Sequence, residues 1–390
     1  MSAPRAKVCI VQYNASSFLT RVDRAARTLA ASGYEVVLIA IKDADTAAFE
    51  QRDGYVVKRV TLRSRRLPRR FGLKYVRFAE GIWRTFLCAW REKADIYDAR
   101  DAYPLLATYV AARLRGARMV YDSDELATGR NQVHAANPVY AWAMRRYERF
   151  FARRCAVITS DEGRADVLER IHGIPRPVVV LNVPETMETV LSDEEFRRIA
   201  LGDRRHLLIY QGVLIANRGI PEMIEAMRLL PECRLAIVGF GALLPRLVRM
   251  VEDEGLGDAV AFFDPVPFRT LMCYTAAADV GVIPLVGSCL SYVTAAPNKL
   301  FEFMMAGIPV AATDLPDMAR VVRETGCGTL ISDPTSPEAI AAAVRALIDD
   351  PEAARTAGAR GRAAALARYN WEVEAPKMLA VFDDLAGEAS

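Results

Sequence analysis

Apolar and polar residues follow one another along this chain in a rhythm that predicts alternating strands and helices in both halves. In the first half, residues 8–11 are predicted to form a strand, residues 17–32 a helix that Gly33 ends, and residues 35–41 the next strand. Such a βαβ unit builds a parallel sheet. The second half restarts the rhythm, with strands expected at 206–210, 235–238, 260–263 and 280–284 and helices at 220–230 and 243–254. We therefore expect an α/β fold of two domains that bind ligands in the cleft at the carboxyl ends of their strands.

The length of 390 residues suits two domains of ordinary size. The run 182–185, Asn-Val-Pro-Glu, indicates the exit from the first domain, and residues 192–201 are expected to form a connecting helix. We place the first domain at 1–190, the second at 191–370, and a final helix at 371–390.

Charge and cysteine usage narrow the class of protein. Lysine and arginine number 51 against 48 acidic residues, so nothing in the composition requires nucleic acid as a partner. Seven scattered cysteines without a C-x-x-C pair indicate reduced thiols, and three distant histidines argue against a histidine-built metal site. With neither an apolar signal region nor a membrane-length apolar run, we expect a cytoplasmic protein, which could also be peripheral on the inner face of the cell membrane.

The segment 297–313 carries the strongest chemical signal. Asn298 is expected to be the N-cap of a helix that Gly307 ends, followed by a buried strand at 308–312. Lys299 would then lie at a helix N-terminus, where the dipole disfavours a cation unless an anion binds nearby. Glu302, one turn on, would accept hydrogen bonds from sugar hydroxyls. The alternative is an ordinary surface pair between Lys299 and Glu302.

Two glycine-containing segments add phosphate-site candidates. The block 208–212, Leu-Ile-Tyr-Gln-Gly, ends a predicted strand at Gly212, and Arg218 opens the following helix. Gly239 and Gly241 end the next strand, but the spacing of a dinucleotide fingerprint is absent. These two glycines are better explained by a tight strand-to-helix turn.

Four blocks together resemble the family 4 glycosyltransferases of the GT-B fold. They are residues 208–220, 236–241, 278–285 and 297–313, and segments 21–36 and 117–126 of the first half support the match. The run 369–372, Tyr-Asn-Trp-Glu, resembles the start of the family's last helix, which crosses back onto the first domain. The resemblance implies two Rossmann-like domains facing across a cleft, with an acceptor-binding N-terminal domain and a C-terminal domain that binds a nucleotide sugar.

The family's chemistry is retaining transfer of a hexose from a nucleoside-diphosphate sugar to an acceptor hydroxyl, without a metal ion or other cofactor. Arg218 and Lys299 would act as catalytic residues by stabilising the leaving diphosphate, together with the helix start at Asn298. Glu302 matches the family's ribose ligand. The remaining residues expected to contact the donor are Gly212, Gly239, Pro265, Val266, Leu271 and Thr294.

Several positions depart from the family pattern. Thr294 stands where the first acid of the E-x7-E motif belongs, and Pro297 has no N–H to offer the sugar. Asp124 stands in place of a catalytic histidine, and we assign it a catalytic role as an acceptor of a sugar hydroxyl's hydrogen bond. The N-terminal loop, with Asn14, Ser16 and Ser17 as acceptor-side candidates, lacks the paired glycines of relatives. Two alternatives therefore stay open: a catalytically silent GT-B partner subunit and a GT-B sugar-nucleotide epimerase.

Asp122 and Asp124 also form an Asp-x-Asp, the metal-binding signature of a different, single-domain glycosyltransferase architecture. That architecture does not account for a second complete α/β half, so we disfavour it. His134 is a candidate for a displaced catalytic histidine, although a surface histidine is the more ordinary explanation.

A basic and aromatic stretch runs from Lys58 to Lys93. It contains twelve basic residues against two acids, with apolar and aromatic residues between them. This composition is typical of a surface that docks on anionic lipid, and a lipid-linked or cell-envelope glycan acceptor would suit it. A solvated basic loop followed by a core-facing helix is the alternative.

Overall fold

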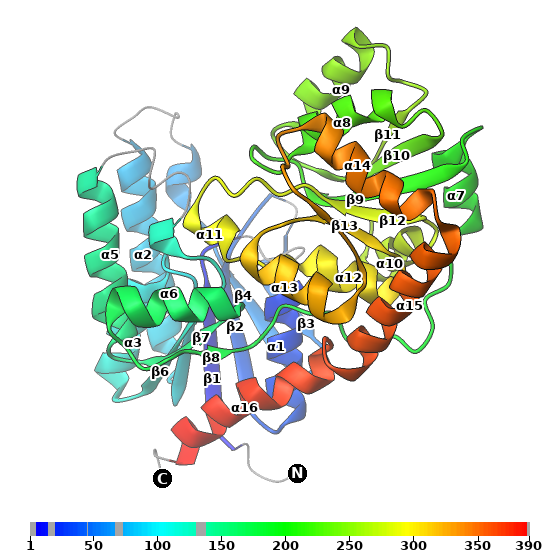
Figure 1. Cartoon of the computed structure of the whole chain (residues 1–390). Helices are drawn as coiled ribbons and strands as arrows, with labels where there is room; N and C mark the ends of the chain where they lie inside the picture. Colours follow the sequence, from blue (N-terminus) through cyan, green and yellow to red (C-terminus); the bar gives the residue numbers. More distant parts are fainter. Residues whose placement is uncertain (1–4, 15–19, 45, 67–72, 130–137, 388–390) are drawn as a thin grey trace. The chain divides into compact units, whose positions relative to one another are not determined.

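The chain folds into two compact α/β units in a computed structural model that describes residues 5–14, 20–44, 46–66, 73–129 and 138–387. The first unit comprises residues Met1–Leu181 and Ala375–Ser390, and the second comprises Asn182–Glu374. Each unit has its own sheet with helices on both faces (Figure 1). The predicted alternation of strands and parallel-sheet units is confirmed.

The sheet of the first unit has, within the described residues, eight strands in the order β3-β4-β2-β1-β5-β6-β7-β8. Neighbouring strands are parallel except for the hairpin of β3 and β4. The strands are β1 Lys7–Gln12, β2 Glu35–Ile41, β3 Phe49–Arg52, β4 Tyr55–Val60, β5 Ile96–Arg100, β6 Arg118–Ser123, β7 Ala156–Thr159 and β8 Val178–Val179. The carboxyl ends of β1, β5 and β6 are neighbours at one edge of this sheet.

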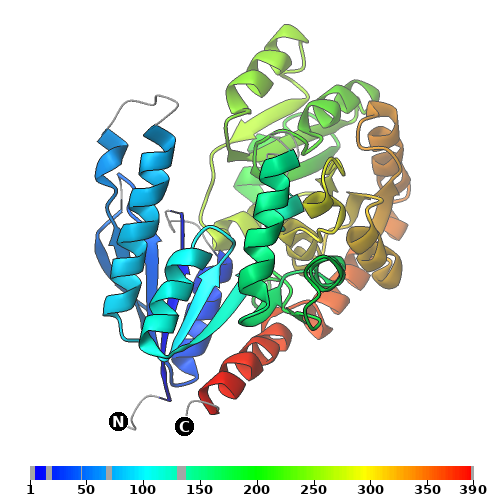
Figure 2. The same ribbon diagram turned by 90° about the vertical axis from the view of Figure 1, so that its left-hand side faces the viewer.

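Helices cover both faces of that sheet. Figures 1 and 2 show α1 on one face and α2 and α3 on the other. Strand β1 is therefore a continuous apolar run, with Val8 to Val11 fully buried. The helices are α1 Thr20–Ala31, α2 Leu73–Arg91, α3 Leu105–Arg115, α5 Pro138–Ala152 and α6 Glu162–His172, with 3₁₀ helices η1 Arg63–Arg66 and η2 Ala127–Gly129.

The last helix, α16 Trp371–Gly387, begins in the second unit and ends in the first. Asn370 starts it, because its side-chain oxygen accepts a hydrogen bond from the Val373 N–H at 3.0 Å. Further along, Phe382 packs edge-on against the ring of Tyr34, whose hydroxyl donates to Asp383 at 2.5 Å. The predicted return of the final helix to the first unit is thus present.

The sheet of the second unit has, in the part of the chain that the structure describes, six parallel strands in the order β11-β10-β9-β12-β13-β14. They are β9 His206–Val213, β10 Cys233–Phe240, β11 Val260–Phe263, β12 Val280–Ile283, β13 Val310–Thr313 and β14 Gly328–Ile331. Strands β9 and β12 pair directly, so the segments that follow them leave the sheet side by side.

Two layers of helices enclose the second sheet. Helices α8 and α14 pack together on one face, and α10 and α12 pack together on the other (Figure 1). The helices are α7 Glu194–Leu201, α8 Ile220–Ala226, α9 Leu244–Asp253, α10 Phe268–Ala276, α11 Leu290–Val293, α12 Asn298–Ala306, α13 Pro316–Thr325, α14 Pro337–Ile348 and α15 Pro351–Ala367, with 3₁₀ helix η3 Met227–Leu229.

Strand β5 is one of the elements that the hydrophobic pattern did not predict. Its sequence, Ile-Tyr-Asp-Ala-Arg, carries two charged residues in five, yet all five are buried. Burial is possible because Asp98 and Arg100 form an ion pair at 2.6 Å inside the unit. A pattern of apolar residues alone cannot reveal such a strand.

Candidate functional site

The ends of β9 and β10 approach each other closely at two glycines of the second unit. Gly212 has φ +124°, and a Cβ there would lie 3.3 Å from the Lys299 ammonium nitrogen. A Cβ on Gly239 would lie 2.0 Å from the carbonyl oxygen of Gly212. Both predicted glycines therefore have a steric reason: Gly239 lets the strands approach, and Gly212 leaves room beside Lys299.

The N-cap of helix α12 lies one residue earlier than expected. Pro297, extended at φ −69° and ψ 147°, occupies the N-cap position, and Asn298 is the first helical residue without a side-chain capping bond. The prediction that Asn298 caps the helix is wrong, because an N-cap residue must be extended and Asn298 is already helical. Gly307 ends the helix in the left-handed conformation, as predicted.

Lys299 lies in the first turn of α12 in an environment that opposes its charge. Its ammonium nitrogen sits 3.7 Å from the centroid of the Tyr210 ring. The residue as a whole is half-buried. Burial and the neighbouring charge of Arg218 lower the pKa of Lys299 to about 7, whereas the negative charge of Glu302 acts to raise it. Two neighbouring cations at a helix start favour a bound anion.

Arg218 and Tyr210 complete this cationic cluster. The Arg218 guanidinium lies over the ring of Tyr292, 4.6 Å from its centroid. Tyr210 is 1% exposed, and its hydroxyl has no hydrogen-bond partner among the described residues. Burial raises the pKa of Tyr210 to about 12, so this hydroxyl keeps its proton and remains available as a donor.

Glu302 is held by a residue to which the sequence argument assigned no role. The Gln211 amide nitrogen donates to the Glu302 carboxylate at 2.5 Å, and the amide oxygen accepts from the Thr275 hydroxyl at 2.7 Å. The Thr275 hydroxyl also lies 2.7 Å from the carbonyl oxygen of Leu271, on the same helix α10. Gln211 thus links the predicted ribose ligand to α10. The sequence feature that could have revealed this role is an amide side chain, Gln211, near the carboxyl end of a buried strand.

The other predicted donor residues lie on loops and helices of the second unit. Thr294 ends α11, and its hydroxyl donates to the carbonyl oxygen of Leu290 at 2.9 Å. Pro265 and Val266 lie in the loop between β11 and α10, and Leu271 lies in α10. Among these, Leu271 is tied to Gln211 through Thr275.

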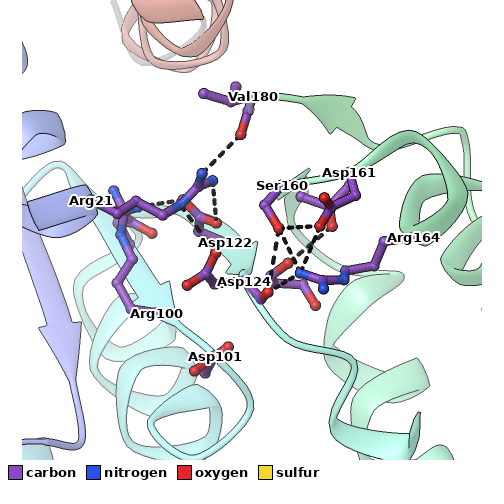
Figure 3. A network of polar contacts seen from close by, with 12 residues as sticks. Arg21, Arg100, Asp101, Asp122, Asp124, Ser160, Asp161, Arg164 and Val180 are labelled. Carbon is purple, nitrogen blue, oxygen red and sulfur yellow. Dashed lines mark hydrogen bonds and ion pairs between the residues drawn. The ribbon is translucent and has the colours of Figure 1, made fainter. Parts of the chain in front are cut away.

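A second polar cluster lies in the first unit and includes Asp124 (Figure 3). The Asp124 carboxylate is about two-fifths exposed and lies 3.6 Å from the Arg21 guanidinium. Arg21 also donates to Asp122 at 3.1 Å and to the carbonyl oxygen of Val180 at 2.8 Å. The negative charge of Asp124 therefore has a cation beside it.

Asp122 is the centre of a buried ion-pair chain. Arg21 contacts it from α1 and Arg100 from β5, and Arg100 also pairs with Asp98 at 2.6 Å. Burial opposes the charged form of Asp122, but Arg100 and Arg21 together keep its pKa below the ordinary value. Burial raises the pKa of Asp98 to about 6, although Arg100 acts against this shift.

The backbone around Asp124 is fixed by hydrogen bonds to its carbonyl oxygen and by a strained turn. The Asp124 carbonyl oxygen accepts from Ser160 at 3.3 Å and from the Arg164 guanidinium. Asp101, at φ +65°, donates its N–H to the Asp122 carbonyl at 2.9 Å, and its carboxylate accepts from the Glu125 N–H at 3.1 Å. Figure 3 shows these groups converging on the turn after β6.

Two family matches together span most of the chain. Residues 192–364 match the family described as Glycosyl transferases group 1, and residues 19–184 match the Glycosyl transferase 4-like domain. This chain belongs to the family 4 glycosyltransferases.

One curated relative is the GDP-mannose-dependent alpha-(1-6)-phosphatidylinositol monomannoside mannosyltransferase of Mycolicibacterium smegmatis. It is 32% identical over 187 residues, which are 46% of this chain and 48% of the relative. The chain thus spans about half the length of the first curated relatives that it matches.

Solved structures match over nearly the whole chain. Sucrose-phosphate synthase from Thermosynechococcus elongatus superimposes with a TM-score of 0.81 at 19% identity, covering 98% of this chain and 99% of its own. HepE of Anabaena, in complex with UDP-glucose, gives a TM-score of 0.76 at 15% identity, covering 97% and 100%. These likenesses confirm the GT-B fold predicted from the sequence.

The acceptor-side candidates of this glycosyltransferase chain are only partly described. Asn14 is exposed at the end of the β1 segment, where its carbonyl oxygen accepts from the Ile41 N–H at 3.1 Å. Ser16, Ser17 and His134 lie outside the described residues. Arg21 and Arg100 are the residues that sequence reasoning missed in this unit. Arg21 belongs to the segment 21–36 that supports the family resemblance, but no function was assigned to it. Arg100 lies in strand β5, which was not predicted.

Proposed function

We propose that this chain transfers a hexose from a nucleoside-diphosphate sugar to an acceptor hydroxyl with retention of configuration. The observation that carries the proposal is the cluster at the start of α12. Lys299 lies over the Tyr210 ring and interacts electrostatically with Arg218, and Glu302 lies one turn further along α12. The Tyr210 hydroxyl has no hydrogen-bond partner among the described residues. Family membership and the GT-B fold support it.

In this proposal the cluster stabilises the leaving group. As the bond between sugar and diphosphate breaks, negative charge grows on the diphosphate, and Lys299 and Arg218 stabilise that charge. Glu302 accepts hydrogen bonds from the donor ribose. Gln211 acts as a positioning residue, because its amide aims the Glu302 carboxylate and ties it to α10.

Asp124 contributes from the first unit as an acceptor of a sugar hydroxyl's hydrogen bond. A carboxylate beside a reacting centre needs a nearby cation, and Arg21 at 3.6 Å supplies one. This ion pair is how the chain accommodates an acid where relatives carry a histidine.

Activity is expected to persist when divalent metal is removed. Lys299 and Arg218 already supply positive charge to the diphosphate, and both guanidinium neighbours of Asp122 would have to be displaced before a metal could bind it. Turnover with and without EDTA measures this. Loss of activity that manganese or magnesium restores would instead support a metal site at Asp122 and Asp124.

The donor's base is the first property to determine by experiment. A curated relative is named for GDP-mannose, and a structural neighbour binds UDP-glucose. Thermal-shift measurements should therefore compare GDP, UDP, ADP and their sugars. A nucleotide at 100 times its dissociation constant stabilises the fold by about 2.7 kcal/mol. If none of these ligands shifts the transition, the donor site is assigned wrongly.

Nucleotide binding is expected to take up a proton above pH 7. With a pKa of about 7, Lys299 is mostly neutral at pH 8 in the free protein, and a bound diphosphate restores its charge. Below pH 7 the lysine is already protonated, so binding should take up no proton there. Above pH 7 the affinity for the nucleotide should fall by up to about tenfold per pH unit. Calorimetry in two buffers of different ionisation enthalpy measures the uptake.

Lys299→Arg is the matched control, because arginine stays charged throughout this range. It should abolish proton uptake at pH 8 while retaining nucleotide binding. Equal uptake by wild type and Lys299→Arg would show that another group titrates.

We further propose a lipid-linked or cell-envelope glycan acceptor at an anionic membrane surface. Helix α2 exposes large apolar side chains, namely Tyr75, Val76, Phe78, Trp83 and Trp90. Some basic residues of the stretch from Lys58 to Lys93 bind acids of their own chain, as Lys58 does with Glu92 and Arg84 with Glu80. No helix of the described residues is long and apolar enough to span a bilayer. Wild-type protein that binds anionic and neutral vesicles equally at low salt would contradict this proposal.

A further inference from the structure

Helix α5 has a clearly defined inner face. Tyr147 and Phe151 pack ring against ring at 4.9 Å, and Phe151 packs against Tyr109 of α3 at 5.2 Å. Glu148 is fully buried, where it accepts a hydrogen bond from Tyr121 at 2.7 Å and lies 3.3 Å from His172. These contacts fix which side of α5 faces the core of the first unit.

The outer face of α5 exposes large apolar residues. Val139 is 69% exposed, Trp142 63% and Phe150 45%. At 100° per residue, these three positions fall within a quarter of the helix circumference, opposite Glu148. Helix α5 stands at the outer edge of the first unit in Figure 1 and faces the viewer in Figure 2.

The charged side chains that α5 and the two residues after it place outside the core are all arginines. Between residues 138 and 154 the sequence holds five arginines, Arg145, Arg146, Arg149, Arg153 and Arg154, and a single acid. That acid is Glu148, whose carboxylate points inward. The exposed side of α5 therefore carries arginines without a carboxylate from its own helix to neutralise them.

Arginine and aromatic side chains are already associated on this face. The Arg146 guanidinium lies 5.9 Å from the Trp142 ring centroid, and that of Arg154 lies 3.8 Å from the Phe150 ring centroid. Cation–π pairs of this kind combine an apolar surface with a positive charge. Lipid headgroups and the acyl boundary offer anionic and apolar partners at the same depth.

We propose that the outer face of α5 docks on an anionic lipid bilayer, with Trp142 inserted and Arg145 and Arg146 at the headgroups. At 15 residues the helix is too short to span a membrane, so it would lie along the surface. This surface is distinct from the stretch between Lys58 and Lys93 and extends the proposed membrane-associated acceptor. A bilayer fits better than a protein partner because the exposed charged residues of α5 are all arginines and stand among large apolar groups.

Flotation of the full chain with vesicles tests this surface. Wild type should bind phosphatidylglycerol-containing vesicles and ignore pure phosphatidylcholine. Arg145→Glu with Arg146→Glu should lower partitioning by about tenfold or more at 0.1 M salt. Trp142→Ala should lower the fraction bound at high salt, where screening leaves mainly the apolar contribution. Arg355→Glu on the exposed side of α15 is the matched control and should bind like wild type.

Fluorescence locates the contact. Brominated lipid should quench wild-type emission more than that of Trp142→Ala. Equal vesicle binding by all variants overturns the proposal, as does a vesicle-independent dimer that Trp142→Ala dissociates, since that result assigns the face to a second copy. Nucleotide binding by each variant checks the fold. It also keeps the two proposals separate, because lipid binding without nucleotide binding contradicts only the transferase.

Discussion

Replacing Lys299 or Arg218 by alanine is expected to weaken nucleoside-diphosphate binding on the order of 10- to 100-fold in each case. Hydrogen bonds to charged groups contribute roughly 1.5–3 kcal/mol. The two residues lie about eighty positions apart but follow adjacent strands, β9 and β12, and the charge of Arg218 helps to lower the pKa of Lys299. Isothermal titration with the preferred nucleoside diphosphate measures both losses.

Arg228→Ala is the matched control for this pair of variants. Arg228 is an exposed arginine of the same unit that pairs with Glu254 on the surface. Its removal should leave affinity unchanged. If Lys299→Ala and Arg218→Ala both bind like Arg228→Ala while remaining folded, the diphosphate lies elsewhere.

Replacing Arg100 by methionine is expected to destabilise the chain by about 3–5 kcal/mol at pH 8. Asp98 and Asp122 are both buried and both pair with Arg100, so its removal leaves Asp98 without its cation. Asp98 has a raised pKa near 6, so its charged form opposes folding, and stability falls as pH rises through this value. The loss should therefore be smaller at pH 5, where Asp98 is protonated. Urea unfolding at both pH values measures it.

Two comparisons make this stability prediction specific. Arg323→Met removes an exposed pair with Asp314 and should cost about 0–1 kcal/mol. Adding Asp98→Asn to Arg100→Met should recover part of the loss, because the amide removes the buried charge. Equal unfolding midpoints for Arg100→Met and Arg323→Met would show that the buried ion pairs of Arg100 do not stabilise the protein more than a surface pair does.

Much of the second unit up to β13 was predictable from its sequence. Its strands are apolar runs, and the change to helical spacing after each of them marks the βα units. Gly212, Arg218, Lys299 and Glu302 lie at strand ends and helix starts, where local sequence determines position. The position of the N-cap was predicted one residue late, since Asn is a frequent cap and Pro297 can be extended equally well.

The contacts between distant segments were not predictable. Gln211 holds Glu302 across 91 positions of sequence, and nothing in the local pattern indicates which side chain an amide will contact. Arg100 lies in a strand whose charges conceal its burial, and Arg21 reaches Asp122 across 101 positions. Arg21 also makes Asp124 one partner of an ion pair, which its sequence neighbours do not indicate.

Hydrolysis of donor sugars by the wild-type chain in the presence of EDTA tests the proposed transfer most directly. GDP- and UDP-hexoses are incubated with the protein, and the released nucleoside diphosphate is measured by chromatography. Slow release from one donor is expected for wild type and Arg228→Ala, and none above background for Lys299→Ala. Intact donors throughout, or equal release by Lys299→Ala, would contradict the proposed transfer.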